Sequence, residues 1–203
     1  SNPMPPSVEI VVMGNGVAIA VGDMTPSHDD DTDFGRVPIA GTGPVTRTFT
    51  ILSNGTSELI LDGTPVIAIG GPDATEFSVI EPPVAQVSPG GSTTFQIRFD
   101  PATLGVRKAT VSMVTNDSDE NPFAFGIEGR GVDLPMVGSP TSEGITATTA
   151  RLGGTVISDQ GSPITERGVV YAKAALDSDL LVGGAGVEQV TADGTTGEFS
   201  MVV

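Results

Sequence analysis

The stretch STTFQIRFD, residues 92–100, decides the fold class of this chain. Its apolar side chains, Phe95, Ile97 and Phe99, alternate with polar ones. Successive side chains of a β-strand point to opposite faces, so this segment has one apolar face and one polar face. The alternation predicts antiparallel sheets with one side packed on a core and the other side in water.

The same period of two recurs along the chain on both sides of this stretch. RKATVSMVT (107–115), PFAFGIEG (122–129) and TRTFTIL (46–52) each place their apolar residues on one face, and turn sequences such as SPGGS separate the runs. Two such sheets stacked face to face make a β-sandwich. We expect strands near residues 8–13, 16–21, 45–52, 58–61, 64–69, 75–80, 92–99, 107–115 and 122–129, and a long loop over 23–46, which lacks alternation.

A second series of strands begins after GRGVDLPMVG, residues 129–138. It comprises TTARLGGTV, ITERGVVYAK, GVEQVTAD and GEFSMVV. The chain is therefore expected to be all-β, with two tandem sandwich domains at 1–133 and 134–203. The linker is short and contains Pro135, which predicts a stiff connection.

Longer strings in both blocks carry family resemblances. PVTRTFTILSNGTSELIL (44–61) and the run from Ser88 to Gly131 resemble bacterial choice-of-anchor D modules, relatives of the abnormal-spindle/Hydin (ASH) type of immunoglobulin-like domain. This resemblance covers roughly Val8 to Val132. ITATTARLGGTVISDQGSPITERGVVYAK (145–173) is similar to fibronectin type III-like repeats of large exported bacterial proteins.

These resemblances imply two tandem immunoglobulin-like β-sandwich domains, the second incomplete. In the fibronectin type III-like family, a segment forming the last two strands follows the position of GEFSMVV. The family contexts imply an extracellular stalk whose partners are neighbouring domains of the same long chain. The start of the sequence, SNPMPPS, has no charged or apolar leader region, so an export signal would have been removed beforehand.

Composition excludes several classes of protein. The net charge of −16, from 25 acidic and 9 basic residues, repels phosphate backbones and anionic lipids, so we expect no nucleic-acid partner. No run approaches 18 apolar residues, so we expect no membrane insertion. The lack of cysteine excludes disulfides, thiolate zinc sites and a cysteine nucleophile.

The sequence offers little catalytic chemistry. His28, in TPSHDDDTDFG, could be a base oriented by an acid, but no nucleophile motif accompanies it, and an exposed loop residue is the favoured interpretation. Carboxylate pairs for glycoside hydrolysis are numerous, yet the chain has no Trp and only one Tyr for a sugar platform. We therefore predict no catalytic residues and a protein that is not an enzyme.

Two acidic runs raise the question of calcium. In NDSDENPF (116–123), Asp117, Asp119 and Asn121 match the first EF-hand positions, but Pro122 stands where the turn needs Gly. The run of Asp29, Asp31 and Asp33 has Phe34 at the glycine position and no acid at position 12. A looser calcium site remains open, with Asp117 and Asp119 as candidate ligands. The favoured interpretation is a hairpin connection capped by its own side chains, with no cofactor and no metal.

Two functions follow from these expectations. The first is a non-enzymatic structural, spacer or adhesin-like module of a large secreted or cell-surface bacterial protein. The alternative is an accessory module attached to a secreted hydrolase, which binds a polysaccharide or a protein ligand.

Overall fold

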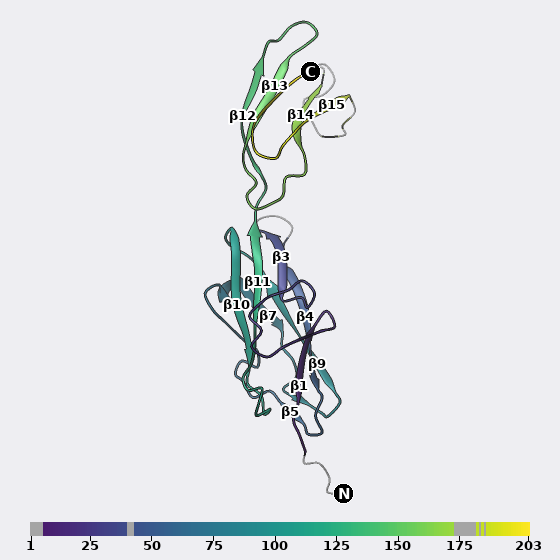
Figure 1. Ribbon diagram of the computed structural model, residues 1–203, viewed down its shortest axis with the longest axis vertical. Helices are drawn as coiled ribbons and strands as arrows, with labels where there is room; N and C mark the ends of the chain where they lie inside the picture. Colours follow the sequence, from purple (N-terminus) through teal and green to yellow (C-terminus); the bar gives the residue numbers. More distant parts are fainter. Residues whose placement is uncertain (1–5, 40–42, 173–181, 183, 185) are drawn as a thin grey trace. The chain divides into compact units, whose positions relative to one another are not determined.

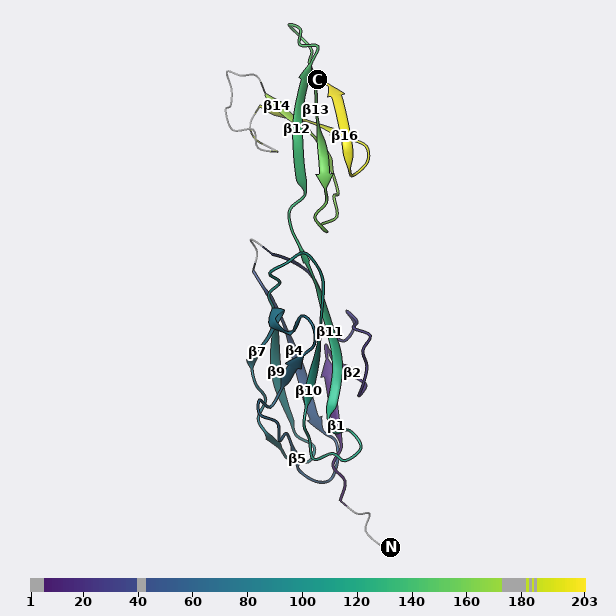
Figure 2. The same ribbon diagram turned by 90° about the vertical axis from the view of Figure 1, so that its left-hand side faces the viewer.

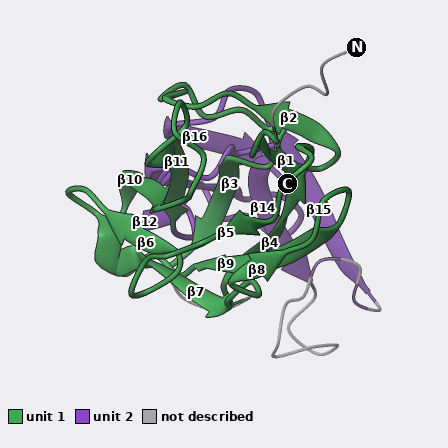
Figure 3. Ribbon diagram, turned by 90° about the horizontal axis from the view of Figure 1, so that it is seen from below, with its two compact units in different colours: residues 1–132 green, residues 133–203 purple. Residues whose placement is uncertain are grey.

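The computed structural model describes residues 6–39, 43–172, 182, 184 and 186–203 (Figure 1). The chain divides into two compact units, residues 1–132 and 133–203 (Figure 3). The described part contains β-strands and one turn of 3-10 helix, η1 (Ala74–Glu76), which confirms the all-β class. No helix among these residues has the length and apolar character needed to cross a membrane.

The two large sheets of unit 1 pack face to face (Figures 1 and 2). The first sheet has the order β2-β1-β4-β9-β7, with strands β2 (Val17–Ile19), β1 (Ile10–Gly14), β4 (Val45–Ser53), β9 (Ser92–Phe99) and β7 (Phe77–Glu81). The second has the order β3-β11-β10-β6, with strands β3 (Asp33–Pro38), β11 (Phe123–Val132), β10 (Gly105–Met113) and β6 (Ala68–Gly70). A two-stranded sheet pairs β5 (Leu59–Ile60) with β8 (Gln86–Val87).

Phenylalanine rings fill the space between these two sheets. Phe49 stacks on its cross-strand partner Phe95 with ring centroids 5.2 Å apart, and it meets Phe125 of the opposite sheet at 5.7 Å. All three rings are fully buried. Burial of such large rings, with favourable ring geometry, is a major source of stability in a core of this kind.

The predicted strand 92–99 coincides with β9, and its inward and outward faces are as expected. The prediction of a long loop over 23–46 is wrong, because β3 lies within it and pairs in parallel with β11. Gly35, with φ of 75°, forms a bulge in β3. Because of the extra residue, Phe34 and Val37 both point inward although they lie three positions apart. The apolar residues of this strand therefore do not recur with a period of two in the sequence.

Two further differences concern short strands. The predicted strand 64–69 is reduced to β6, because residues 64–67 form bends around Pro65, which has no N–H to donate to a sheet. The two-residue strand β8 was not expected, since it is too short to show alternation.

The described residues of unit 2 also form two sheets, but they bury far fewer apolar side chains than unit 1 does. One sheet has the order β12-β13-β16, and the other pairs β14 with β15; their strands are β12 (Met136–Glu143), β13 (Arg151–Ser158), β16 (Gly197–Val202), β14 (Arg167–Ala172) and β15 (Val187–Ala192). Among its described apolar side chains only Val156 is buried, at 5% exposure. Leu152, Phe199 and Met201, on the same face of this sheet, are half-buried. The absence of closing strands stays a prediction.

Substitutions along β9 test the pleat directly. Phe95→Ala should lower the free energy of unfolding by about 3–5 kcal/mol, because it removes a fully buried ring. Ile97→Ala, on the same face, should lower it by about 2–5 kcal/mol. Gln96→Ala, on the opposite face, should lower it by less than about 1 kcal/mol. Denaturant unfolding measures all three, and equal losses at 95 and 96 would contradict the sandwich.

The two units should differ when they are expressed separately. A fragment of residues 1–132 should unfold cooperatively as a monomer, because it contains the whole core cluster. A fragment of residues 133–203 should lack a cooperative transition or self-associate through its exposed strand edges. Calorimetry and analytical ultracentrifugation check this expectation, and a monomeric, cooperative 133–203 fragment would contradict it.

Candidate functional site

The acidic loop between β10 and β11 uses its amide side chains to hold neighbouring backbone. The side chain of Asn116 accepts a hydrogen bond from the Ile60 N–H (2.8 Å) and donates one to the Glu58 carbonyl (3.0 Å). The Asn116 amide thereby forms the same pair of hydrogen bonds with the backbone at β5 that a residue of a neighbouring strand would form. Asn121 closes the loop by accepting a hydrogen bond from the Thr115 N–H at 3.2 Å.

Asp117 is the most buried acid of this loop, with 1% of its surface exposed. Its Oδ2 accepts a hydrogen bond from the N–H of Ile10, the first residue of β1, at 3.0 Å. Its Oδ1 accepts a longer one from the Asp119 N–H at 3.4 Å. A carboxylate held by backbone donors is stabilised without a cation. Asp117 therefore fastens the start of β1 to the loop.

The two candidate calcium ligands do not belong to a larger ligand set. Asp119 is exposed, and both oxygens of Asp117 already accept backbone hydrogen bonds. Glu128, which the EF-hand spacing would place at position 12, lies in β11 and pairs with Lys108 at 3.2 Å. Within the described ranges, no group of three or more acidic or histidine side chains is arranged to hold a metal ion. The hydrogen bonds of the loop are those of a capped turn, and the absence of a metal stays a prediction.

Glu120 lies in an unfavourable electrostatic environment. Burial of its carboxyl raises its pKa, and the nearby carboxylates of Asp117, Glu9 and Asp119 raise it further. Its Oε2 is buried, and within the described part of the chain it has no hydrogen-bond partner. The charged form of Glu120 is therefore disfavoured in the folded state.

The first acidic run is also committed to local contacts. Asp30, which is buried, accepts hydrogen bonds from the N–H and the hydroxyl of Thr32 at 3.1 and 2.6 Å. Asp31 pairs with Arg47 of β4 at 3.1 Å. The run thus caps its own turn and attaches that turn to the first sheet.

The sequence allowed two interpretations of His28, a base oriented by an acid or an exposed loop residue. In the structure an acid does contact His28, and it is Asp33 of β3 and not one of the adjacent aspartates. The His28 Nδ1 lies 2.7 Å from Asp33 Oδ2. The His28 side chain is 68% exposed, which agrees with the interpretation as an exposed loop residue. Among the described residues, no serine or threonine hydroxyl is hydrogen-bonded to the imidazole. The pair therefore lacks the nucleophile of a triad.

The His28–Asp33 pair lies at the edge of a pocket of about 350 Å³ on the outer face of the second sheet. The pocket is lined by His28, Asp33, Gly35, Arg36, Val106, Glu128, Gly129 and Arg130. The bulge at Gly35 builds it, because the extra residue places both Asp33 and Arg36 on the outer face, opposite Phe34 and Val37. The sequence analysis missed this pocket. The Gly in DFGR was the available signal, because a Gly inside a strand often marks a bulge.

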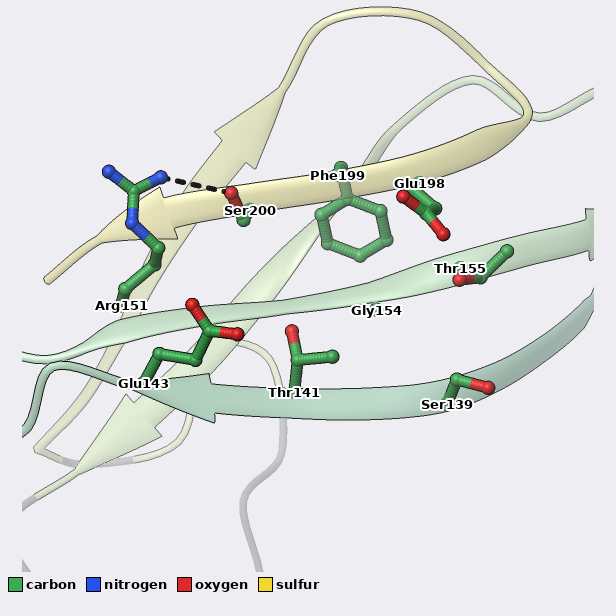
Figure 4. Close-up of a pocket in the computed structure, with 9 residues that line it drawn as sticks. All are labelled: Ser139, Thr141, Glu143, Arg151, Gly154, Thr155, Glu198, Phe199 and Ser200. Atoms are coloured by element: carbon green, nitrogen blue, oxygen red, sulfur yellow. Dashed lines mark hydrogen bonds between the residues drawn. The ribbon is translucent and has the colours of Figure 1, made fainter.

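A second depression, of about 430 Å³, lies on the three-stranded sheet of unit 2 (Figure 4). Gly154 is one of its lining residues, and at the preceding Gly153 a Cβ would come within 2.2 Å of the Phe199 carbonyl oxygen. Around it stand charged and hydroxyl side chains of β12, β13 and β16, and Arg151 donates a hydrogen bond to the Ser200 hydroxyl at 3.1 Å. The Phe199 side chain belongs to the other face of β16, with the Arg167 guanidinium 5.4 Å from its centroid.

Comparison with known proteins relates unit 1 to one family. The model of the HYDIN/CFA65/VesB-like, Ig-like domain matches residues 27–129, just over half of the chain. No curated protein matches the chain.

Solved structures similar to this chain have low sequence identity. A protein of unknown function from Porphyromonas gingivalis W83 is 16% identical, with 62% of this chain and 46% of that chain covered and a TM-score of 0.42. The Vibrio cholerae VesB protease is 13% identical over 48% of this chain and 30% of its own, with a TM-score of 0.34. The ASH/PapD-like domain 7 of human CEP192 is 14% identical over 66% and 93%, with a TM-score of 0.36. The chain spans less than half the length of the first two.

Removing the Asp117 carboxylate should destabilise unit 1, whether or not calcium is present. Asp117→Ala leaves the Ile10 N–H without its acceptor in a buried position, so unfolding should require about 1–3 kcal/mol less free energy. Asp119→Ala, at an exposed position, should change stability by less than about 0.5 kcal/mol.

Calcium itself should change the melting temperature of the wild-type chain by less than about one degree, relative to sodium chloride at matched ionic strength. Differential scanning calorimetry measures this shift. A larger, calcium-specific increase that Asp119→Ala abolishes would contradict the capped-turn interpretation.

The raised pKa of Glu120 predicts a pH-dependent effect of Glu120→Gln. A raised pKa means that the folded state holds the proton more tightly than the unfolded state, so wild-type stability falls as pH rises from the ordinary glutamate pKa through the higher pKa of the folded state. The variant should therefore be more stable than wild type at pH 7. The difference should disappear below the ordinary pKa of 4.5. Glu81→Gln, at an exposed position of β7, is the control and should stay within about 0.5 kcal/mol of wild type.

Proposed function

Because the chain belongs to the HYDIN/CFA65/VesB-like immunoglobulin-like domain family, we propose that it is a non-enzymatic spacer or adhesin-like module of a larger secreted or cell-surface bacterial protein. In this role, unit 1 is a stable block that separates the chain segments on its two sides. The neighbouring domains of the same long chain are its first partners.

The observation that carries this proposal is the placement of the two ends of unit 1. Ile10 opens β1 beside Asp117, in the loop that leads into β11. The chain leaves unit 1 at Val132, at the far end of the ten-residue strand β11. Ten residues of extended strand span about 33 Å. The chain therefore enters unit 1 at one end of the sandwich and leaves it at the other (Figure 2).

The chemistry of unit 1 supports a mechanical role. The acids that could have formed a site cap turns, fasten strand β1 or pair with arginines. The core of two sheets has its phenylalanine rings in contact across the interface. Such a block resists force through packing and through the hydrogen bonds of its long strands.

Single-molecule force spectroscopy tests the spacer role. Because the chain has no cysteine, Ser7→Cys and Asp133→Cys create a unique pair of attachment points. Unit 1 should unfold in a single event with a gain in contour length of about 400 Å, given about 3.3–3.6 Å per extended residue. The Phe95→Ala chain should unfold at lower force, and Gln96→Ala should match the wild type. Gradual extension without a distinct unfolding event would contradict the proposal.

A second candidate function is an accessory module that binds a polysaccharide or protein ligand beside a secreted hydrolase. The pocket that contains His28 and Asp33 favours this candidate, because charged groups of both signs converge there beside exposed Val106. Ligand pockets combine a few placed polar groups with apolar surface in a similar way.

A further inference from the structure

The outer face of β3 and β11 carries two arginines that are left out of the ion pairs of unit 1. The other four cationic side chains of the unit each lie within 4.0 Å of a carboxylate: Arg47 with Asp31, Arg98 with Asp100, Arg107 with Asp73, and Lys108 with Glu128. Within the described part of the chain, Arg36 and Arg130 form no such pair, although acids outnumber bases 25 to 9.

Arg36 and Arg130 are also direct neighbours in the parallel register of β3 and β11. Both are exposed, and both line the pocket that contains His28 and Asp33. Like charges opposite one another on adjacent strands repel, so this arrangement destabilises the sheet locally. An anionic group placed between the two guanidinium groups would remove the repulsion and form charge-assisted hydrogen bonds with both.

The remaining walls of the pocket supply a different set of contacts. Asp33 contacts His28, and Glu128 forms an ion pair with Lys108, so the positions of the two acids are fixed. Their oxygens can still accept hydrogen bonds from hydroxyl groups. Val106, 45% exposed and opposite Arg130 in the register of β10 and β11, adds an aliphatic surface.

These three kinds of contact match one chemical class. The guanidinium forks suit a carboxylate, the acid oxygens suit ring hydroxyls, and the Val106 methyl groups suit the C–H face of a sugar. The volume of about 350 Å³ falls within the usual range for small-ligand pockets. We propose that this pocket binds a uronate unit, the carboxylate-bearing sugar of an acidic polysaccharide. The inference rests on the binding-module candidate and is independent of the spacer role.

The overall charge of the protein limits how such a polymer binds. The net charge of −16 opposes a densely charged polyanion at low ionic strength. At physiological ionic strength the screening length is about 8 Å, so the contacts with Arg36 and Arg130 dominate. Affinity for a uronate oligomer should therefore change less with salt than affinity at a purely basic surface does.

Calorimetric titration of the full chain with trigalacturonate tests the proposal, with the fully methyl-esterified trisaccharide as the matched neutral ligand. We expect the acid to bind and the ester to bind at least about tenfold more weakly, because the ester cannot form the charge-assisted pairs. Arg36→Gln and Arg130→Gln should each weaken binding of the acid by about tenfold or more. Arg98→Gln, on the first sheet and paired with Asp100, should leave binding unchanged.

Other outcomes of the same experiment would overturn the inference. Equal binding of acid and ester, or no binding of either, would contradict a uronate site. Displacement of the trisaccharide by equimolar sulfate or acetate would identify a general anion site instead. Melting temperatures of the variants report whether each one folds, and amide NMR shifts at Gly35 in the wild-type chain locate the site without any substitution. The force experiment on unit 1 is unaffected by these results, so the two proposals fail independently.

Discussion

The contact of Phe49 with Phe95 in its own sheet and with Phe125 in the opposite sheet is the interaction on which unit 1 depends. These rings fix the distance and the register of the two layers, because each one comes from an inward position of a strand with period-two alternation. Once the layers are fixed, the loops at both ends of the sandwich have defined starting points. Asp117 of the acidic loop can then accept the hydrogen bond from the Ile10 N–H of β1. In the same way, His28 can contact Asp33 of β3.

Several acids of unit 1 accept hydrogen bonds from backbone N–H groups and so have structural roles. Asp117 accepts the first N–H of β1, and Asp30 caps its own turn. Asp73 accepts the Lys108 N–H at 2.8 Å, and this hydrogen bond, together with the nearby Arg107, lowers the pKa of Asp73. A carboxylate with backbone donors is a structural element, so an acidic run in a sequence is weak evidence for a metal.

Among the residues that the structure describes, the unit with more facing strands has the larger core. In unit 1, two sheets of five and four strands bury all seven of its phenylalanine rings. In unit 2, a three-stranded sheet and a two-stranded sheet leave Phe199 half-buried against the Arg167 guanidinium. Arg167 also donates hydrogen bonds to the Asp193 and Thr196 carbonyls, so it holds the turn before β16. In unit 2, the contacts of Arg167 thus help to hold the strands and turns together, as apolar packing does in unit 1.

The sequence by itself determined the all-β class, the faces of the long strands and the capping character of NDSDENPF. These features depend on neighbours in the chain: the pleat alternates residue by residue, and Asn or Asp side chains reach backbone a few positions away. Only the tertiary structure decided that β3 exists, that Asp33 rather than the adjacent acids orients His28, and that Arg36 lies beside Arg130. The bulge at Gly35 breaks local periodicity, and the register between β3 and β11 joins segments about 95 residues apart. No local pattern encodes a pairing over that separation, because it is the packing of the whole sandwich that selects it.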